Sequence, residues 1–109
     1  MYEPSKCYKS FHIAGFQHHD GAFVLGELKP GTRLDLVPER DNPHDPNAVA
    51  LFFKDTMLGY VPADCNELIA RMMFFGHADL FEAHVLQVNP ELDPWKQVRV
   101  RIDIADKRQ

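Results

Sequence analysis

The sequence predicts a mainly β (α+β) fold, a small and partly closed OB- or SH3-like β-barrel of five to six strands with one main helix. Three observations lead to this prediction. Short runs of apolar or alternating residues recur along the chain, turns rich in proline and glycine separate them, and a helical pattern occurs once. A chain of 109 residues, 45% of them hydrophobic, is large enough for one core and too short for two. We therefore expect one domain over residues 8–105, a lead-in at 1–7 and a tail at 106–109.

The first part of the chain predicts two strands with an ambiguous segment between them. Residues 8–16 have the pattern of a strand that places His12 on its outer face. Residues 22–28 fit a short strand or a helical turn equally well, because so short a segment does not define a period. Residues 29–31, with the sequence Lys-Pro-Gly, suit a type II turn, which leads into a half-buried strand at residues 32–37.

Two successive turns, which we call the double turn, follow at residues 38–47. Asn42 and Asp45 can each accept a hydrogen bond from the backbone N–H group two residues on, and two prolines restrict the backbone beside them. Such a rigid loop holds exposed side chains, above all His44 and Asp45, at fixed positions, as binding loops do. A purely structural turn would recruit the same residue types, and the physics of turns alone favours that simpler interpretation.

The next segments predict a hairpin and a helix. Residues 48–53 are apolar throughout, as in a central strand, and residues 57–61 form the returning strand. Gly59 provides a thin point where another backbone or a ligand can approach. Asp64 and Glu67 have the spacing of a capping box at the start of a helix.

The helix carries its large side chains on one stripe, which we expect to face the core, and Gly76 ends it. Two further strands are predicted at residues 80–88 and 97–104, the second with a regular alternation of apolar and polar residues. The helix stripe consists of Leu68, Ile69, Met72, Met73 and Phe75. The outward positions of the last strand are Gln97, Arg99, Arg101 and Asp103, and its inward positions are Val98, Val100, Ile102 and Ile104.

Charge and composition exclude several classes of function. A net charge of −4 and a pI near 5.8 argue against a protein that coats duplex DNA, since that activity needs many cations to neutralise phosphates. Cys7 and Cys65 form no paired motif, and the N-terminus lacks the apolar run of a signal peptide. No stretch has the roughly eighteen consecutive apolar residues of a membrane helix. We therefore expect a cytoplasmic protein with no membrane partner.

One extended motif carries a family resemblance. Residues 34–49 read LDLVPERDNPHDPNAV and residues 58–62 read LGYVP. This pair resembles the HIRAN domain, whose pattern runs N-P-(aromatic)-D-x-N-A-(aliphatic) and then G-(Y/H)-(aliphatic)-P. The match continues at residues 11–15 and 29–31, so a HIRAN-like domain is expected over nearly the whole chain. HIRAN domains occur fused to chromatin-remodelling helicases and also alone in bacteria. The resemblance implies a small β-barrel that binds the 3′-hydroxyl end of single-stranded DNA.

The resemblance also implies roles for individual residues. By position, Asp45 matches the acidic residue that receives the terminal hydroxyl, and His44 takes the place of the preceding aromatic residue. Tyr60 matches the Tyr or His after the hairpin glycine. Phosphate donors could come from Arg40 and Lys54, or from the outward-facing Arg33, Arg99 and Arg101. The first strand has Phe11-His12 where DNA-binding relatives have an Arg and an aromatic residue, which predicts weaker phosphate binding. The predicted nucleic-acid-binding residues are His12, Arg40, Asn42, His44, Asp45, Lys54 and Tyr60.

No motif predicts catalysis or a cofactor. The chain has no P-loop and no nucleophile motif, so we expect no enzyme activity. Cys65 lies at a predicted helix start, but it has no identifiable base, and we interpret it as an inert thiol. The six histidines show neither an H-x-x-x-H pattern nor a cysteine pair at ligand spacing, so no structural metal is expected.

Three functional hypotheses are compared. The first, which the resemblance implies, is a nucleic-acid-binding module for 3′-hydroxyl ends of single-stranded DNA. The second is a protein-interaction or adaptor domain that uses the double turn or a sheet edge to dock a partner chain. The third and weakest is a metal-binding domain of a nucleic-acid-processing system, built from His and Asp residues. The dependence of binding on salt separates the first two, because phosphate contacts impose a steep salt slope.

Overall fold

The computed structural model of the chain describes residues 5–105. The first strand already begins at Ser5, so the end of the predicted lead-in belongs to the sheet. The remainder of the lead-in, residues 1–4, and the predicted tail at 106–109 lie outside the described residues.

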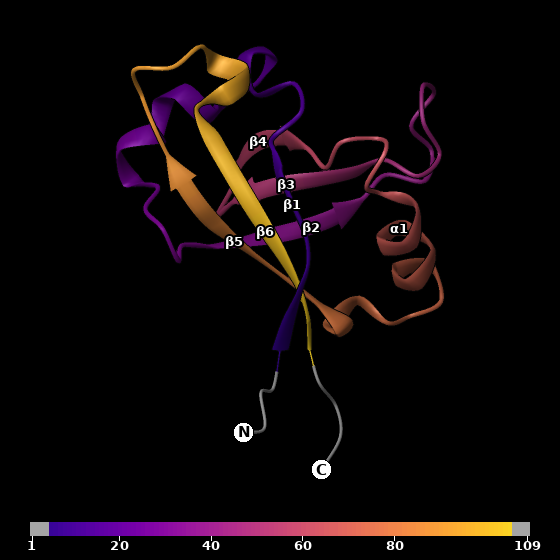
Figure 1. Ribbon diagram of the computed structural model, residues 1–109. Coiled ribbons are helices and arrows are strands. Elements are labelled where there is room, and N and C mark those ends of the chain that lie inside the picture. Colours follow the sequence, from indigo (N-terminus) through magenta and orange to yellow (C-terminus); the bar gives the residue numbers. More distant parts are fainter. Residues whose placement is uncertain (1–4, 106–109) are drawn as a thin grey trace.

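In the described part of the chain, six antiparallel strands form one curled sheet, with one α-helix against it (Figure 1). The sheet order is β1-β6-β5-β2-β3-β4, so the strands of the double turn, β2 and β3, are neighbours. The predicted mainly β class, the strand number and the single main helix are confirmed. The strands are β1 (Ser5–His12), β2 (Arg33–Pro38), β3 (Val49–Phe53), β4 (Thr56–Tyr60), β5 (Phe81–Val88) and β6 (Val98–Ala105).

Within residues 5–105, one isolated backbone bridge brings the two ends of the sheet together. Ala14, just after β1, and Tyr60, at the end of β4, exchange two N–H···O=C hydrogen bonds of 2.9 Å each. Gly59 has φ of 148°, and a Cβ atom on it would lie 2.5 Å from the carbonyl oxygen of Ala14. Only glycine therefore allows this close approach, and the sheet is partly closed, as predicted.

The core fills the inside of the curled sheet. β3 is buried along almost its whole length, as expected for a central strand, while β5 and β6 alternate between buried and partly exposed positions. Alternation at period two places one face of each strand in the core. The most deeply buried large side chains are Ile13, Leu34, Leu51, Leu58, Ile69, Ile102, Val49, Val61, Val98 and Val100.

Short 3₁₀-helices connect β1 to β2. They are η1 (Phe16–His18), η2 (Asp20–Phe23) and η3 (Leu25–Glu27), so the ambiguous segment at residues 22–28 forms helical turns rather than a strand. The predicted first strand ends at His12 because the chain reaches a left-handed residue at Gly15 and turns into η1. The turn before β2 is confirmed, since Thr32 N–H donates to the Lys29 carbonyl at 2.9 Å.

The start of helix α1 (Glu67–Phe74) differs from the prediction. Asn66 occupies the N-cap position, and no side chain caps the helix. The predicted capping box is therefore wrong: Asp64 lies two residues too early and accepts a weak hydrogen bond from Cys65 Sγ instead.

The exposure of the helix also differs in part. Ile69 is buried, and Met72 and Met73 pack against the core, as predicted. Leu68 is 41% exposed and Phe75 is 66% exposed, so the prediction that these two members of the stripe face the core is wrong. The helix has only eight residues, and Phe75 already lies beyond its last one.

One polar residue of β6 faces an unexpected environment. The alternation of the strand predicts that Asp103 points outward into solvent, but this residue is 8% exposed. Arg101 Nε donates to Asp103 Oδ1 at 2.6 Å, and His84 Nδ1 lies 4.0 Å from Oδ2, so burial is compensated by hydrogen bonding and charge. Two more 3₁₀-helices, η4 (Ala78–Leu80) and η5 (Pro94–Lys96), precede β5 and β6. Within residues 5–105, no helix is long and apolar enough to span a bilayer.

Candidate nucleic-acid interface

Hydrogen bonds from its own side chains hold the double turn. Asn42 Oδ1 accepts from the N–H groups of His44 at 2.8 Å and Asp45 at 3.1 Å. Asp45 Oδ1 accepts from Asn47 N–H at 2.9 Å. Both predicted side-chain-to-backbone turns are therefore present, and they fix the backbone that carries His44 and Asp45.

A second contact holds the other oxygen of the Asp45 carboxylate. Asn66 Nδ2 donates to Asp45 Oδ2 at 2.9 Å, and Asn66 is only 2% exposed. A carboxylate has about four acceptor sites, so two hydrogen bonds leave capacity for another donor. Asn66 is absent from the predicted site because no local motif links residues that lie 21 positions apart. The two hydrogen bonds thus hold the carboxylate in one orientation and leave some of its acceptor sites open.

Tyr60 is held against the double turn by its hydroxyl group. Tyr60 Oη donates to Glu39 Oε1 at 2.8 Å, and Asn42 Nδ2 donates to the same oxygen at 3.1 Å. The hydrogen bond to Glu39, partial burial and the Glu39 charge together raise the pKa of Tyr60. The His19 ring meets the Tyr60 ring edge-on, with centroids 5.7 Å apart. The Tyr60 ring therefore packs against His19, and its hydroxyl is occupied.

A cavity of about 300 Å³ opens beside Asp45. This volume is at the lower end for small-molecule sites and suits a single flat ring system. The cavity combines apolar surface with a polar rim. The apolar residues are Ala14, Ala48, Val61 and Ala63. The polar residues are Asn42, His44, Asp45, Tyr60 and Asn66.

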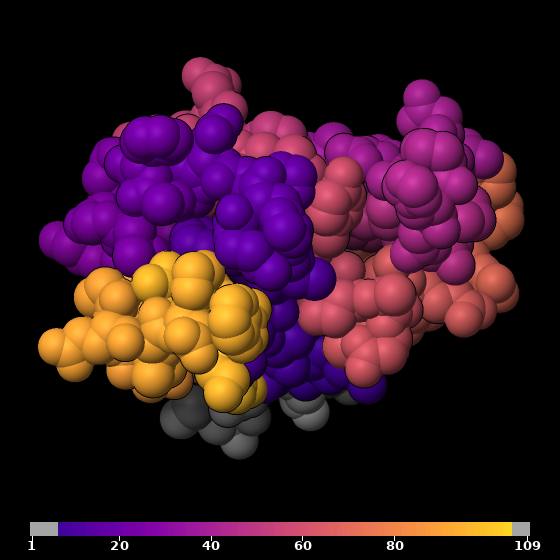
Figure 2. Space-filling view, turned by 90° about the horizontal axis from the view of Figure 1, so that it is seen from above, coloured from indigo at the N-terminus to yellow at the C-terminus, as the bar shows by residue number. Residues whose placement is uncertain are grey.

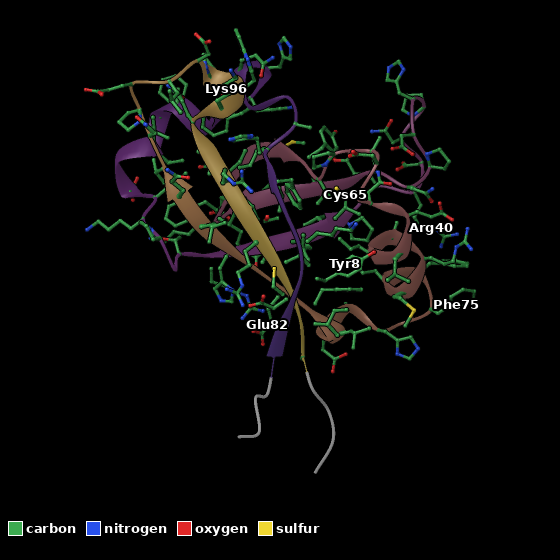
Figure 3. The ribbon with its side chains drawn as sticks, in the orientation of Figure 1. Tyr8, Arg40, Cys65, Phe75, Glu82 and Lys96 are labelled. Carbon is green, nitrogen blue, oxygen red and sulfur yellow. The ribbon has the colours of Figure 1, made fainter. Side chains whose placement is uncertain are left out.

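Four of the seven predicted site residues line this cavity, and the two cations predicted near the double turn do not. The Arg40 guanidinium stacks 3.5 Å above the ring of Phe74 on α1, and Figure 3 shows Arg40 beside that helix. Lys54 lies in the turn between β3 and β4, at the far end of β3 from the double turn, with its amino group over Phe53. Arg40 and Lys54 therefore do not converge on Asp45.

His12, the seventh predicted residue, lies beside the cavity rather than in it. It pairs with Arg99 across the β1–β6 ladder and precedes the cavity residue Ala14 by two positions. Partial burial and the positive charges of Arg99 and Lys96 lower the pKa of His12. Arg99 on β6 and Lys96 on η5 are thus the cations that act on His12 beside the cavity.

The arrangement suits binding better than metal or thiol chemistry. Among residues 5–105, no group of three His, Cys, Asp or Glu side chains is placed to hold a metal ion. Burial, together with the hydrogen bond and charge of Asp64, raises the pKa of Cys65. A raised thiol pKa reduces the thiolate population that nucleophilic chemistry requires.

Comparisons with known proteins agree on the fold. A crystal structure of a protein from Lactobacillus plantarum, structural genomics target LpR91B, superposes with a TM-score of 0.75 and 21% identity, covering 94% of this chain and 96% of that one. The crystal structure of the HIRAN domain of human HLTF superposes with a TM-score of 0.65 and 15% identity, covering 95% of this chain and 82% of that one. No curated protein sequence matches this chain.

The sequence itself matches a family model over almost the full length of the described structure. The model of the HIRAN domain matches residues 8–105, which include the double turn, the β3–β4 hairpin and all the cavity residues. This range spans well over half of the chain, and the expected resemblance is confirmed. The chain belongs to the HIRAN domain family, a family of DNA-binding modules.

Proposed function

We propose that this domain binds the 3′-hydroxyl end of single-stranded DNA in the cavity beside Asp45. The observation that carries the proposal is the state of the Asp45 carboxylate. Its two oxygens accept hydrogen bonds from Asn47 N–H and Asn66 Nδ2, and they retain acceptor sites beside a ring-sized cavity. A terminal hydroxyl is a donor that can use such a site, whereas a phosphorylated end would bring a negative charge against it.

The remaining side chains of the rim supply the other contacts that a strand end needs. Single-stranded nucleic acids bind through flat side chains on which bases stack. Tyr60 offers its ring rather than its hydroxyl, because Glu39 already accepts from Oη. His44 is exposed at the rim and offers a second flat group. In this proposal the terminal base enters between these rings, and Asn42 keeps the loop in shape.

The proposed role is binding and not catalysis, and the negative charge of the site favours binding of a strand end. The double turn carries Glu39, Asp41 and Asp45, and the chain has a net charge of −4. These charges repel a polyanion over about 8 Å at physiological salt. A site that recognises one end of a strand needs few phosphate contacts near this loop, unlike a site that covers a long stretch of DNA.

Nuclear magnetic resonance titration tests the proposal. A short oligonucleotide with a free 3′-hydroxyl should shift the resonances of Asn42, His44, Asp45 and Tyr60. The same oligonucleotide with a 3′-phosphate should leave these resonances unchanged at equal concentration. Equal shifts with both oligonucleotides would refute recognition of the end.

A protein-interaction role is the second candidate, and one surface favours it. Phe74 is 49% exposed and Phe75 is 66% exposed, although large aromatic side chains are usually buried, and Arg40 stacks on the first of them. Binding of a protein partner there would change little with salt, and substitution of Phe75 would weaken it. Binding of DNA in the cavity would weaken as salt rises and would not depend on Phe75.

A further inference from the structure

Arg99 on β6 has a donor group that nothing in the described structure satisfies. Its Nη2 donates to Ser10 Oγ at 3.0 Å, while its Nε is buried and has no hydrogen-bond partner. Buried polar groups are nearly always paired, so an orphaned guanidinium donor is an exception that needs an explanation. Because Nε is closed to solvent, a bound acceptor would reach the guanidinium through its other nitrogens, on a side chain that is partly exposed.

Positive charge gathers around this group. Arg99 faces His12 in the β1–β6 ladder, and residues that face each other in an antiparallel pair project to the same side. Lys96 ends η5, immediately before β6, and Figure 3 shows it at that end of the strand. Its charge, together with that of Arg99, contributes to the lowered pKa of His12.

No acidic side chain within residues 5–105 forms an ion pair with Arg99 or Lys96. The neighbouring Arg101 differs, since Asp103 holds it at 2.6 Å. The positive charges of Arg99 and Lys96 are therefore available to a ligand. An acceptor with several oxygens and a negative charge, such as a phosphodiester, matches a guanidinium fork best.

This basic cluster adjoins the cavity. His12 and Ala14 are two residues apart on a nearly extended chain, a separation of about 7 Å, and Ala14 lines the cavity. Figure 2 shows the indigo N-terminal segment between the orange-yellow region of η5 and β6 and the pink segment after β4. A strand whose end enters the cavity can thus reach the basic cluster by crossing β1.

We propose that Arg99, with Lys96 and His12, binds the backbone phosphates of the nucleotides that precede the strand end held beside Asp45. This inference rests on the proposed function and adds the route of the strand. It also supplies the cations that the double turn lacks, since Arg40 packs on Phe74 and Lys54 lies at the far end of β3.

The test compares two arginine substitutions in the full chain. Arg99→Gln removes the guanidinium of the cluster, and Arg71→Gln is the matched control, because Arg71 lies on α1 in an ion pair with Glu67. Affinity for a fluorescently labelled oligothymidylate with a free 3′-hydroxyl is measured by anisotropy over a salt series. Arg99→Gln should weaken binding about tenfold at low salt, as expected for loss of a charge-assisted hydrogen bond. The slope of log affinity against log salt should fall by about 0.7 for the lost single-strand phosphate contact.

The control and a second variant interpret the result. Arg71→Gln should bind within about twofold of the wild type with an unchanged salt slope, because a solvent-exposed ion pair contributes little. Arg99→Lys keeps the charge and should recover part of the affinity and most of the slope. Circular dichroism melting shows whether each variant is folded, and an Arg99→Gln variant that retains wild-type melting must still show the slope change.

The outcomes separate this inference from the proposed function. An Arg99→Gln variant with wild-type affinity and slope would overturn the phosphate route, even if the protein still distinguishes 3′-hydroxyl from 3′-phosphate ends. A weakened variant in a protein that binds both ends equally would overturn end recognition while supporting the phosphate contact. If the wild type binds no oligothymidylate but binds an acidic peptide through Arg99, both proposals are wrong.

Discussion

Replacement of Asp45 by Asn separates its proposed role from that of an ordinary acidic surface residue. Asn keeps the size of the side chain and an oxygen that can accept from Asn47 N–H, but an NH₂ group would then face the Asn66 Nδ2 donor. Loss of that hydrogen bond should lower the free energy of unfolding by about 1–3 kcal/mol. Loss of a charge-assisted bond from a 3′-hydroxyl should weaken DNA binding by about 1.5–3 kcal/mol, or roughly 10- to 150-fold.

The opposite sign is expected if Asp45 does not contact the ligand. Removal of a negative charge about 4–8 Å from a phosphate relieves a repulsion of about 0.5–1 kcal/mol in a water-like dielectric. Binding would then become tighter by about two- to fivefold. The predicted loss is larger than this gain, so the direction of the change alone distinguishes the two roles.

Fluorescence anisotropy with a labelled oligonucleotide measures the effect, with 3′-hydroxyl and 3′-phosphate ends compared for each protein. Asp41→Asn is the matched control, because Asp41 is an exposed residue of the same loop that does not line the cavity. The control should keep the preference for the 3′-hydroxyl and bind slightly more tightly. Tighter binding by Asp45→Asn, or an undiminished preference for the 3′-hydroxyl end, would refute the reasoning.

Three other predictions concern stability and pH. Asn42→Ala removes the acceptor of two backbone N–H groups and should lower the free energy of unfolding in urea by about 1–3 kcal/mol; no change would mean that the double turn is held by other forces. Gly59→Ala places a Cβ against the Ala14 carbonyl at a φ of 148° and should cost about 2–4 kcal/mol in the same assay, whereas wild-type stability would contradict the close approach. The pKa of His12 is lower in the folded protein than its ordinary 6.5, so the unfolded chain binds the proton more readily. Stability should therefore fall as pH drops below 6.5 toward the folded-state pKa, and His12→Gln should lack this component when urea midpoints are compared between about pH 5 and 7.5.

Local patterns predict the sheet well because each depends on neighbouring residues. Alternation in residues 97–104 and the apolar run at 48–53 follow from strand geometry, and the turn at Gly31 needs only its own positive φ. The two hydrogen bonds of Asn42 and the one of Asp45 in the double turn are similarly local. These parts of the fold therefore follow from the amino-acid sequence alone.

Predictions fail where distant segments decide the environment. Asn66 holds Asp45 across 21 positions, and no spacing rule joins them. Asp103 is buried because Arg101 and His84 surround it, although its position in the alternation indicates an exposed residue. Phe75 has helical spacing from Met72, which packs against the core, but the helix has already ended at Phe74. The failures at Asn66 and Asp103 reflect tertiary packing that a one-dimensional pattern does not contain, and the failure at Phe75 reflects the position at which the helix ends.

The seven predicted site residues likewise divide into those that the structure brings to the cavity and those that it places elsewhere. Asn42, His44 and Asp45 share one loop, and Tyr60 reaches them because the hairpin glycine lets β4 meet the end of β1. Arg40 and Lys54 are predicted because they are in or close to the double turn in sequence. Arg40 instead stacks on Phe74, and Lys54 is separated from the cavity by the length of β3. Proximity along the chain therefore brings the loop residues to the cavity but does not bring Arg40 and Lys54 there.

A crystal structure of the domain with a short single-stranded oligonucleotide tests the central claim most directly. Our account predicts that the 3′-terminal oxygen lies about 2.5–2.7 Å from an oxygen of the Asp45 carboxylate, with the last base against Tyr60. An oligonucleotide that crosses the domain with its 3′ end in solvent, or that leaves the cavity beside Asp45 empty, would contradict it.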